Sequence, residues 1–252
     1  NWGKSEVDYS ISTAKWIHRN PYDVLAGLEL QKGGSYKTNV DWNAILDEHG
    51  KLRLSLGLYA PDTITGLGKT GEGYHTHEDL FWTGFQGDPT KGKPADQSWY
   101  GMSNLVVDKT PITSEDFNTS FNTGHGKHWF VDGKISKEGE WNYRSVSGYL
   151  PTWRWWVEHS EDSAPLKGRY DFDQAYNGGN SLAFEGDLKA NSSQNVMLYS
   201  TKIPVTEKTK LSVSHKGGVG AAAWVAVATK EDYSEYEWKE LTPSADWSKI
   251  GR

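Results

Sequence analysis

The chain has 252 residues and a formal net charge of −6 at pH 7, and its Lys and Arg residues form no cluster. This charge disfavours nucleic acid and anionic membranes as partners, and no apolar run is long enough to span a membrane. Cysteine is absent, which excludes disulfides and thiolate chemistry. The chain has 13 Trp and 13 Tyr but only 7 Phe, which suits either sugar binding or the core of a β-rich protein.

The first predicted element is an amphipathic helix. Ser5 is its expected N-cap, with an acidic residue three positions later, and Pro21 follows its end. Apolar residues recur between them at helical spacing: Val7, Ile11, Ala14 and Ile17. Further helices are expected over residues 40–48 and 74–85.

Two runs, Tyr22–Gln31 and Leu52–Pro61, alternate with the period of a β-strand. In each run one face is apolar, while the other is mixed and carries a glycine. Two residues after that glycine stands a polar or aromatic side chain, Glu29 in the first run and Tyr59 in the second. At the rim of a (β/α)₈ barrel these two side chains would face the same mouth. The alternative is a pair of strands in some other buried sheet.

The order helix, strand, helix, strand, helix is the repeating unit of an α/β barrel. We therefore predict the C-terminal part of a (β/α)₈ TIM barrel, with its C-terminal extension, over residues 1–159. Within it a short strand is expected at 105–110 and an extended segment packed on the barrel at 149–157. Both ends of the chain resemble cuts through a fold, which predicts a fragment of a longer or a nicked polypeptide.

The last third of the chain has a different character. Residues 160–167 are polar, include a proline and are predicted to be a linker. Residues 168–252 contain short strands separated by Gly, Asn and Ser clusters, with no amphipathic helix between them. This spacing predicts an antiparallel β-sandwich of the jelly-roll type, similar to galactose-binding-like modules, that is too short to be complete.

Other motifs are weaker candidates for chemistry. The string His75, His77 and Asp79 imitates metal ligands, but it opens a predicted helix on which positions two apart diverge, so a solvated helix face is favoured. His125 and His128 are placed in a loop without neighbouring acids. The tryptophans of the 149–157 segment are assigned to core packing rather than to a sugar shelf: Trp153, Trp155 and Trp156. No metal site and no cofactor is predicted.

Several segments in the same order resemble glycoside hydrolase family 85, the endo-β-N-acetylglucosaminidases, and most closely the endo-D-like enzymes of Gram-positive bacteria. They are NW before the first helix, NPYDVLAGLELQ, LSLGLYAP, DLFWTGFQGDP, FNTSFNTGHGKHWFVDGK and YLPTWRWW. The resemblance covers roughly residues 1–158. It implies retaining hydrolysis between the two core N-acetylglucosamines of N-linked glycans, with the substrate's acetamido group as nucleophile and an oxazolinium intermediate.

The resemblance also implies where the site residues lie. The family's acid/base Glu and acetamide-orienting Asn form an Asn-x-Glu motif, which is absent from these 252 residues. No catalytic residue is therefore expected in this chain, and the pair is expected upstream. Trp2, Glu29 and Tyr59 are the expected substrate-binding residues. Asn1 stands where the family often has an aromatic residue, so the substrate contact made by that aromatic residue is not expected here.

The expected partners are an N-linked glycan or glycoprotein substrate and the N-terminal half of the same enzyme, which would complete the barrel. Nucleic acid and membrane insertion are not expected, and the predicted location is secreted or associated with a bacterial cell wall. Two other functions stay open: a non-catalytic carbohydrate-binding module, and a barrel hydrolase of another glycan that contains N-acetylglucosamine, such as chitin.

Overall fold

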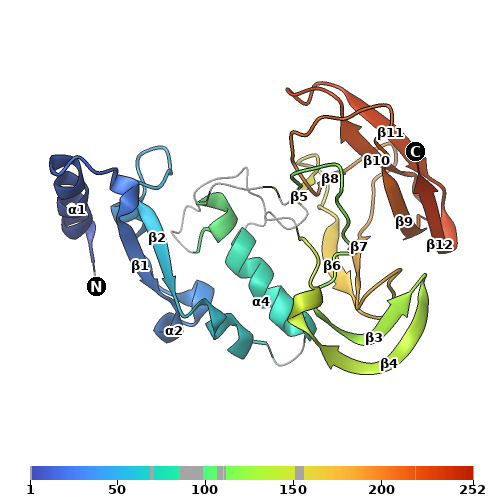
Figure 1. The fold of residues 1–252 in the computed structure, drawn as a ribbon, viewed down its shortest axis with the longest axis horizontal. Helices are drawn as coiled ribbons and strands as arrows, with labels where there is room; N and C mark the ends of the chain where they lie inside the picture. Colours follow the sequence, from blue (N-terminus) through green and yellow to red (C-terminus); the bar gives the residue numbers. More distant parts are fainter. Residues whose placement is uncertain are drawn as a thin grey trace. The chain divides into compact units, whose positions relative to one another are not determined.

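The structure is a computed structural model, and it divides into two compact units that we describe separately (Figure 1). The described residues are 2–68, 71–85, 99–106, 110, 112–150, 156–218 and 220–251. The first unit comprises Asn1–Asp108 with Thr152–Trp156, and the second comprises Lys109–Pro151 with Val157–Arg252. In the described part of the chain, no helix is long and apolar enough to cross a membrane.

The first unit contains the helices and two parallel strands. In chain order its elements are α1 (Lys4–Trp16), η1 (Pro21–Asp23), β1 (Leu25–Glu29), α2 (Leu30–Gly33), η2 (Ser35–Lys37), α3 (Trp42–Ile45), β2 (Ser55–Tyr59), η3 (Pro61–Gly66), α4 (Gly71–Thr83) and η4 (Met102–Asn104). Both predicted strands are therefore present, each shorter than its run. The predicted helices correspond to α1, the one-turn α3 and α4.

Helix α1 begins earlier than the sequence predicted. Gly3, not Ser5, is the N-cap, and its N–H donates to the Glu6 carboxylate at 2.9 Å. The apolar face of α1 is as predicted, because Val7, Ile11 and Ala14 are all buried.

One hydrophobic core covers a single face of the two strands. Ala26 and Leu28 of β1 are buried in it, together with Leu54, which precedes β2. Trp42 of α3 is almost fully buried, and its ring stacks on that of Tyr100 with a centroid distance of 4.6 Å. The core thus occupies the face of β1 that the alternation assigned to helices, whereas Leu25, Gly27 and Tyr59 on the opposite face of the two strands are exposed.

The second unit is built from strands. They are β3 (His125–Val131), β4 (Lys134–Asn142), β5 (Trp156–Glu158), β6 (Lys167–Asp171), β7 (Ser181–Glu185), β8 (Asn195–Met197), β9 (Ser212–Gly217), β10 (Ala223–Ala228), β11 (Tyr236–Leu241) and β12 (Ser244–Gly251), with the short η5 (Arg144–Val146) after β4. The pairs β3–β4, β6–β7, β9–β12 and β10–β11 are antiparallel, and β5 pairs with β8. A β-rich C-terminal segment is therefore present.

The β3–β4 hairpin was not predicted; the sequence placed its histidines in a loop. Its turn is Asp132-Gly133, and both residues have positive φ values, 50° and 77°. An Asp-Gly pair between alternating runs is the signature of a two-residue hairpin turn, so the signal was present in the sequence.

The hairpin is bonded to the segment between β6 and β7. Phe130 and Gly178 exchange both backbone hydrogen bonds, at 2.9 and 3.1 Å, and the Gly133 N–H donates to Tyr176 O at 2.8 Å. These contacts place the hairpin in the second compact unit, which begins at Lys109, whereas the sequence predicted a linker at 160–167. Within the segment predicted to be a linker, Ser163 is buried, and Lys167 is the first residue of β6.

Candidate functional site

The uncovered face of the two parallel strands is the strongest candidate site. Register pairs Gly27 with Gly57 and Glu29 with Tyr59, so partners lie at the same level and point to the same side of the sheet. Figure 1 shows β1 and β2 side by side, with both strands running in the same direction. The C-terminal ends of parallel strands are where α/β folds place their ligands. Glu29 and Tyr59 therefore form one row at the edge where a ligand is expected.

Trp2 lies beside this row of residues. Its indole Nε1 donates a hydrogen bond of 2.8 Å to the carbonyl oxygen of Gly27. The side chain is half-buried and packs against the hydrophobic core. Because the only donor of the indole is engaged by the strand, the ring itself is what Trp2 can present to a ligand.

Glu29 is held by the backbone that follows it. Its Oε1 accepts the N–H groups of Gln31 at 2.9 Å and of Lys32 at 3.4 Å, so Glu29 is the N-cap of the one-turn helix α2. Both hydrogen bonds use the same carboxylate oxygen. The capping contacts fix the direction of the side chain at the end of β1.

Tyr59 is the last residue of β2, and its side chain is 62% exposed. The chain turns away sharply after it, because Ala60 has a left-handed backbone (φ 53°) and Pro61 starts the 3-10 helix η3. A non-glycine residue in this region costs conformational energy, which the adjoining turn must offset. The turn leaves the phenol of Tyr59 projecting from the end of the strand.

The connections that follow the two strands are joined by a buried tyrosine. Tyr36, in η2 after β1, contacts Nδ1 of His77, on α4 after β2, at 2.6 Å, and the two rings stack at 5.8 Å. Burial raises the pKa of the Tyr36 phenol above its ordinary value. This contact stabilises the loops near the ends of β1 and β2.

The expectation of a solvated face for the histidines of α4 is wrong for His75. Its side chain is buried, and Nδ1 lies 3.0 Å from Oε2 of Glu78. His77 stacks on Tyr36 as described. Among the described residues, no group of three His, Cys, Asp or Glu side chains is placed to hold a metal ion.

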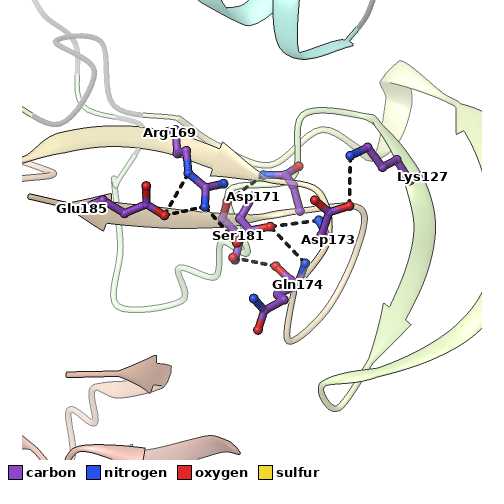
Figure 2. Close-up of polar contacts among 8 residues, drawn as sticks. Lys127, Arg169, Asp171, Asp173, Gln174, Ser181 and Glu185 are labelled. Atoms are coloured by element: carbon purple, nitrogen blue, oxygen red, sulfur yellow. Dashed lines mark hydrogen bonds and ion pairs between the residues drawn. The ribbon is translucent and has the colours of Figure 1, made fainter. Parts of the chain in front are cut away.

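In the second unit, polar contacts hold the turn between β6 and β7 (Figure 2). Arg169 Nη2 donates to Glu185 Oε1 at 2.6 Å across the strand pair, and Asp171 Oδ1 accepts the N–H of Asp173 at 2.9 Å. Lys127 of β3 pairs with Asp173 at 2.9 Å. Each carboxylate here serves another group of the protein, so the cluster is structural.

The segment before β3 is anchored to the same turn. Asn180 is fully buried, and its Oδ1 accepts from the N–H and hydroxyl of Thr123 at 3.0 and 3.1 Å, while its Nδ2 donates to Phe121 O at 2.8 Å. These hydrogen bonds bridge more than fifty residues of sequence. They position the hairpin that carries His125 and His128, which lie on strand β3 and not in a loop.

The aromatic segment near residue 153 is only partly visible. Trp153 and Trp155 lie outside the described residues. Trp156 is half-buried at the start of β5. The extended segment predicted for 149–157 and the short strand predicted for 105–110 also fall partly outside the described residues; Met102–Asn104, just before the latter, form the 3-10 turn η4.

Comparison with known proteins agrees with this architecture. A crystal structure of the glycoside hydrolase domain of Endo-D from Streptococcus pneumoniae R6 superposes with a TM-score of 0.93 and 62% identity, over 100% of this chain and 40% of that one. The fold of this chain is therefore that of part of a glycoside hydrolase domain. Residues 1–129 match the model of glycosyl hydrolase family 85, and the chain belongs to this family.

Two curated relatives are more distant. The cytosolic endo-β-N-acetylglucosaminidase of Danio rerio is 25% identical over 198 residues, which is 78% of this chain and 24% of the relative. The cytosolic endo-β-N-acetylglucosaminidase 1 of Arabidopsis thaliana is 23% identical over 204 residues, 79% of this chain and 27% of the relative. The chain thus spans about a quarter of the curated relatives it matches.

Proposed function

We propose that this chain is part of an endo-β-N-acetylglucosaminidase that hydrolyses the bond between the two core N-acetylglucosamines of N-linked glycans. The observation that carries the proposal is the row Glu29–Tyr59 with Trp2 beside it, within a chain of family 85. The names of the solved neighbour and of both curated relatives support the substrate class. The reaction retains configuration through an oxazolinium formed by the substrate's acetamido group.

Each residue of the row has a chemical task in this proposal. The exposed phenol of Tyr59 donates to the acetamide as that group develops charge, and the Glu29 carboxylate accepts hydrogen bonds from sugar hydroxyls. The indole of Trp2, whose Nε1 is engaged by Gly27, stacks on a sugar ring. The Asn-x-Glu pair that carries acid/base catalysis lies outside this chain, since none of its 252 residues forms that motif.

The proposal includes a fold that extends beyond these two strands. A parallel pair with one face uncovered is not stable alone, because parallel sheets are covered on both faces and contain several strands. We propose that β1 and β2 are neighbouring strands of a (β/α)₈ barrel completed by the N-terminal half of the enzyme. We also propose that residues 168–252 belong to a jelly-roll-like sandwich; the antiparallel pairs β6–β7, β9–β12 and β10–β11 support it.

The test compares the chain alone with the full-length polypeptide. Purified residues 1–252 should release no glycan from an N-glycosylated peptide, whereas the full-length protein should leave one N-acetylglucosamine on the asparagine. Mass spectrometry of the peptide distinguishes this product from complete deglycosylation. Robust turnover by residues 1–252 alone would overturn the assignment of the catalytic pair to another segment.

Glycoprotein substrates of a bacterial enzyme lie outside the cell, so the proposed location is secreted or bound to the cell wall. Fractionation of the source organism into medium, wall and cytoplasm, followed by immunodetection, tests it. Detection in the cytoplasm alone would contradict the proposal.

A further inference from the structure

Two glycines interrupt the candidate site one level below Glu29 and Tyr59. Gly27 and Gly57 are register partners in the middle of β1 and β2, on the uncovered face of the sheet. Neighbouring strands lie about 4.8 Å apart, and successive residues on one face of a strand about 6.6 Å apart. The pair therefore leaves an area without side chains between the row Leu25–Ser55 and the row Glu29–Tyr59.

The chain's own backbone does not require these glycines. Neither has the positive φ that favours glycine. A Cβ added to Gly27 would meet nothing within 4 Å, and one added to Gly57 would make ordinary contacts with Leu25, the nearest at 3.6 Å. Glycine within a strand is less stable than alanine, and it often marks the close approach of a ligand or another backbone.

Trp2 is attached to β1 at the level of this area. Its indole is hydrogen-bonded to the carbonyl oxygen of Gly27 itself, so the aromatic ring is held beside the glycine pair. Apart from its two chain neighbours, no residue would lie within 4 Å of a Cβ on Gly27, so this Cβ would not disturb the indole. The area is thus a flat floor of backbone, with an aromatic side chain next to it and polar groups at its upper edge.

We propose that Gly27 and Gly57 are specificity-determining residues: they form the floor on which one N-acetylhexosamine ring lies, and their missing side chains set how bulky that ring and its acetamido substituent can be. This inference rests on the proposed function and assigns it a steric filter. The alternative is that the floor packs against other strands of the barrel interior. A bulky side chain at Gly27 would then lower the stability of the protein, whereas a floor that faces a sugar would leave the stability unchanged.

The experiment uses Gly27→Ala, Gly27→Val and Gly57→Val in the full-length protein. Gly251→Val is the matched control, since Gly251 is an exposed strand residue of β12 without positive φ, and its added Cβ would lie 3.6 Å from the Ser212 Cβ. We expect KM for an N-glycosylated peptide to rise about tenfold or more in the valine variants and less in Gly27→Ala. The thermal midpoint of Gly27→Ala should stay unchanged or rise.

Two results would overturn the inference. Unchanged KM in Gly27→Val and Gly57→Val, with wild type active, would refute the filter and leave the proposed function standing. A thermal midpoint lowered in Gly27→Val but not in Gly251→Val would show that protein, not sugar, occupies the floor. If the wild-type protein does not cleave the glycopeptide, the proposed function fails. The floor can then still be tested by calorimetry with N,N′-diacetylchitobiose. The inference stands only if Gly251→Val binds this disaccharide and Gly27→Val does not.

Discussion

At the scale of single residues, Glu29 and Tyr59 occupy equivalent strand positions but have different freedom. The Glu29 carboxylate is already bonded to the backbone of α2, whereas the phenol of Tyr59 projects into solvent. In the proposed function, a carboxylate that binds a non-reacting hydroxyl would bind ground state and transition state alike, while a phenol that donates to the reacting acetamide would bind the transition state more strongly.

Tyr59→Phe keeps the ring and removes the hydroxyl. If this hydroxyl donates to the reacting acetamide, kcat in the full-length enzyme should fall by the equivalent of about 1.5–3 kcal/mol, with little change in KM. Steady-state kinetics on a glycopeptide measure both constants, and equal thermal midpoints confirm intact folding. A kinetically silent variant would remove Tyr59 from the site.

Glu29→Gln removes the charge but retains a side-chain oxygen that can accept from Gln31 and Lys32. We expect KM to rise and kcat to stay near wild type, because a sugar hydroxyl loses a charged acceptor in both states. Glu29→Ala is the control for the cap: it should also lower stability by about 1 kcal/mol. The prediction is wrong if Glu29→Gln mainly lowers kcat.

Trp2→Ala removes a ring that is half-buried and bonded to Gly27. Loss of stacking should weaken substrate by about 1–3 kcal/mol, seen in KM and in the binding of a substrate analogue. Trp42→Ala, in the core, is the comparison and should affect stability far more. Unchanged KM and unchanged analogue binding in Trp2→Ala would place Trp2 in the core.

At the scale of elements, an ion pair attaches helix α1 to the segment that leads into β2. Asp8 of α1 contacts the guanidinium of Arg53, which also donates to the carbonyl oxygen of Ala44 at 2.8 Å. Lys4 adds a second contact to Asp8 at 3.0 Å. The hydrogen bond from Arg53, followed by that from Lys4, holds the pKa of the Asp8 carboxyl below its ordinary value of 3.8.

This pKa predicts an acid-sensitive contribution to stability. The unfolded state binds the proton more tightly than the folded one, so the contribution is present above the ordinary pKa of Asp and is lost as the pH falls through the lowered folded pKa. Asp8→Asn should therefore be less stable than wild type at pH 6, and the difference should shrink at pH 3. Thermal midpoints of both proteins across this range test it; a constant difference would show that the charge of Asp8 is irrelevant.

At the scale of the whole molecule, the family match and the compact units do not coincide. The match covers residues 1–129 and ends within β3, whereas the units divide after Asp108. The hairpin β3–β4 is thus continuous in sequence with the hydrolase region but bonded to the C-terminal strands through Phe130 and Gly178.

The exposed apolar groups of the first unit predict how residues 1–252 behave in isolation. Trp16 is 81% exposed and Leu25 63%. Exposed apolar side chains and the unpaired edges of a short parallel sheet associate with other protein surfaces in solution. Residues 1–252 should therefore self-associate and bind a hydrophobic dye, and co-production with the proposed N-terminal half of the barrel should reduce both effects. Size-exclusion chromatography measures the first effect; a monodisperse monomer without dye binding would contradict the completed-barrel proposal.

The sequence alone determined the strands and their faces. Alternation has a period of two residues, so Ala26 and Leu28 could be assigned to the covered face and Gly27 and Glu29 to the other from neighbouring residues only. The family resemblance was carried by short segments in a fixed order, and the family match confirmed it. The helix face of α1 could be predicted for the same local reason.

Contacts between distant residues were decided by the tertiary structure alone. The bond from Trp2 to Gly27 spans 25 residues and that from Tyr36 to His77 spans 41, and no local pattern encodes either. His75 is buried because other parts of the chain pack on α4, so the polar character of its side chain wrongly indicated exposure to solvent. Helical and strand periods are set by the backbone within a few residues, whereas burial and pairing depend on which surfaces meet after the chain has folded.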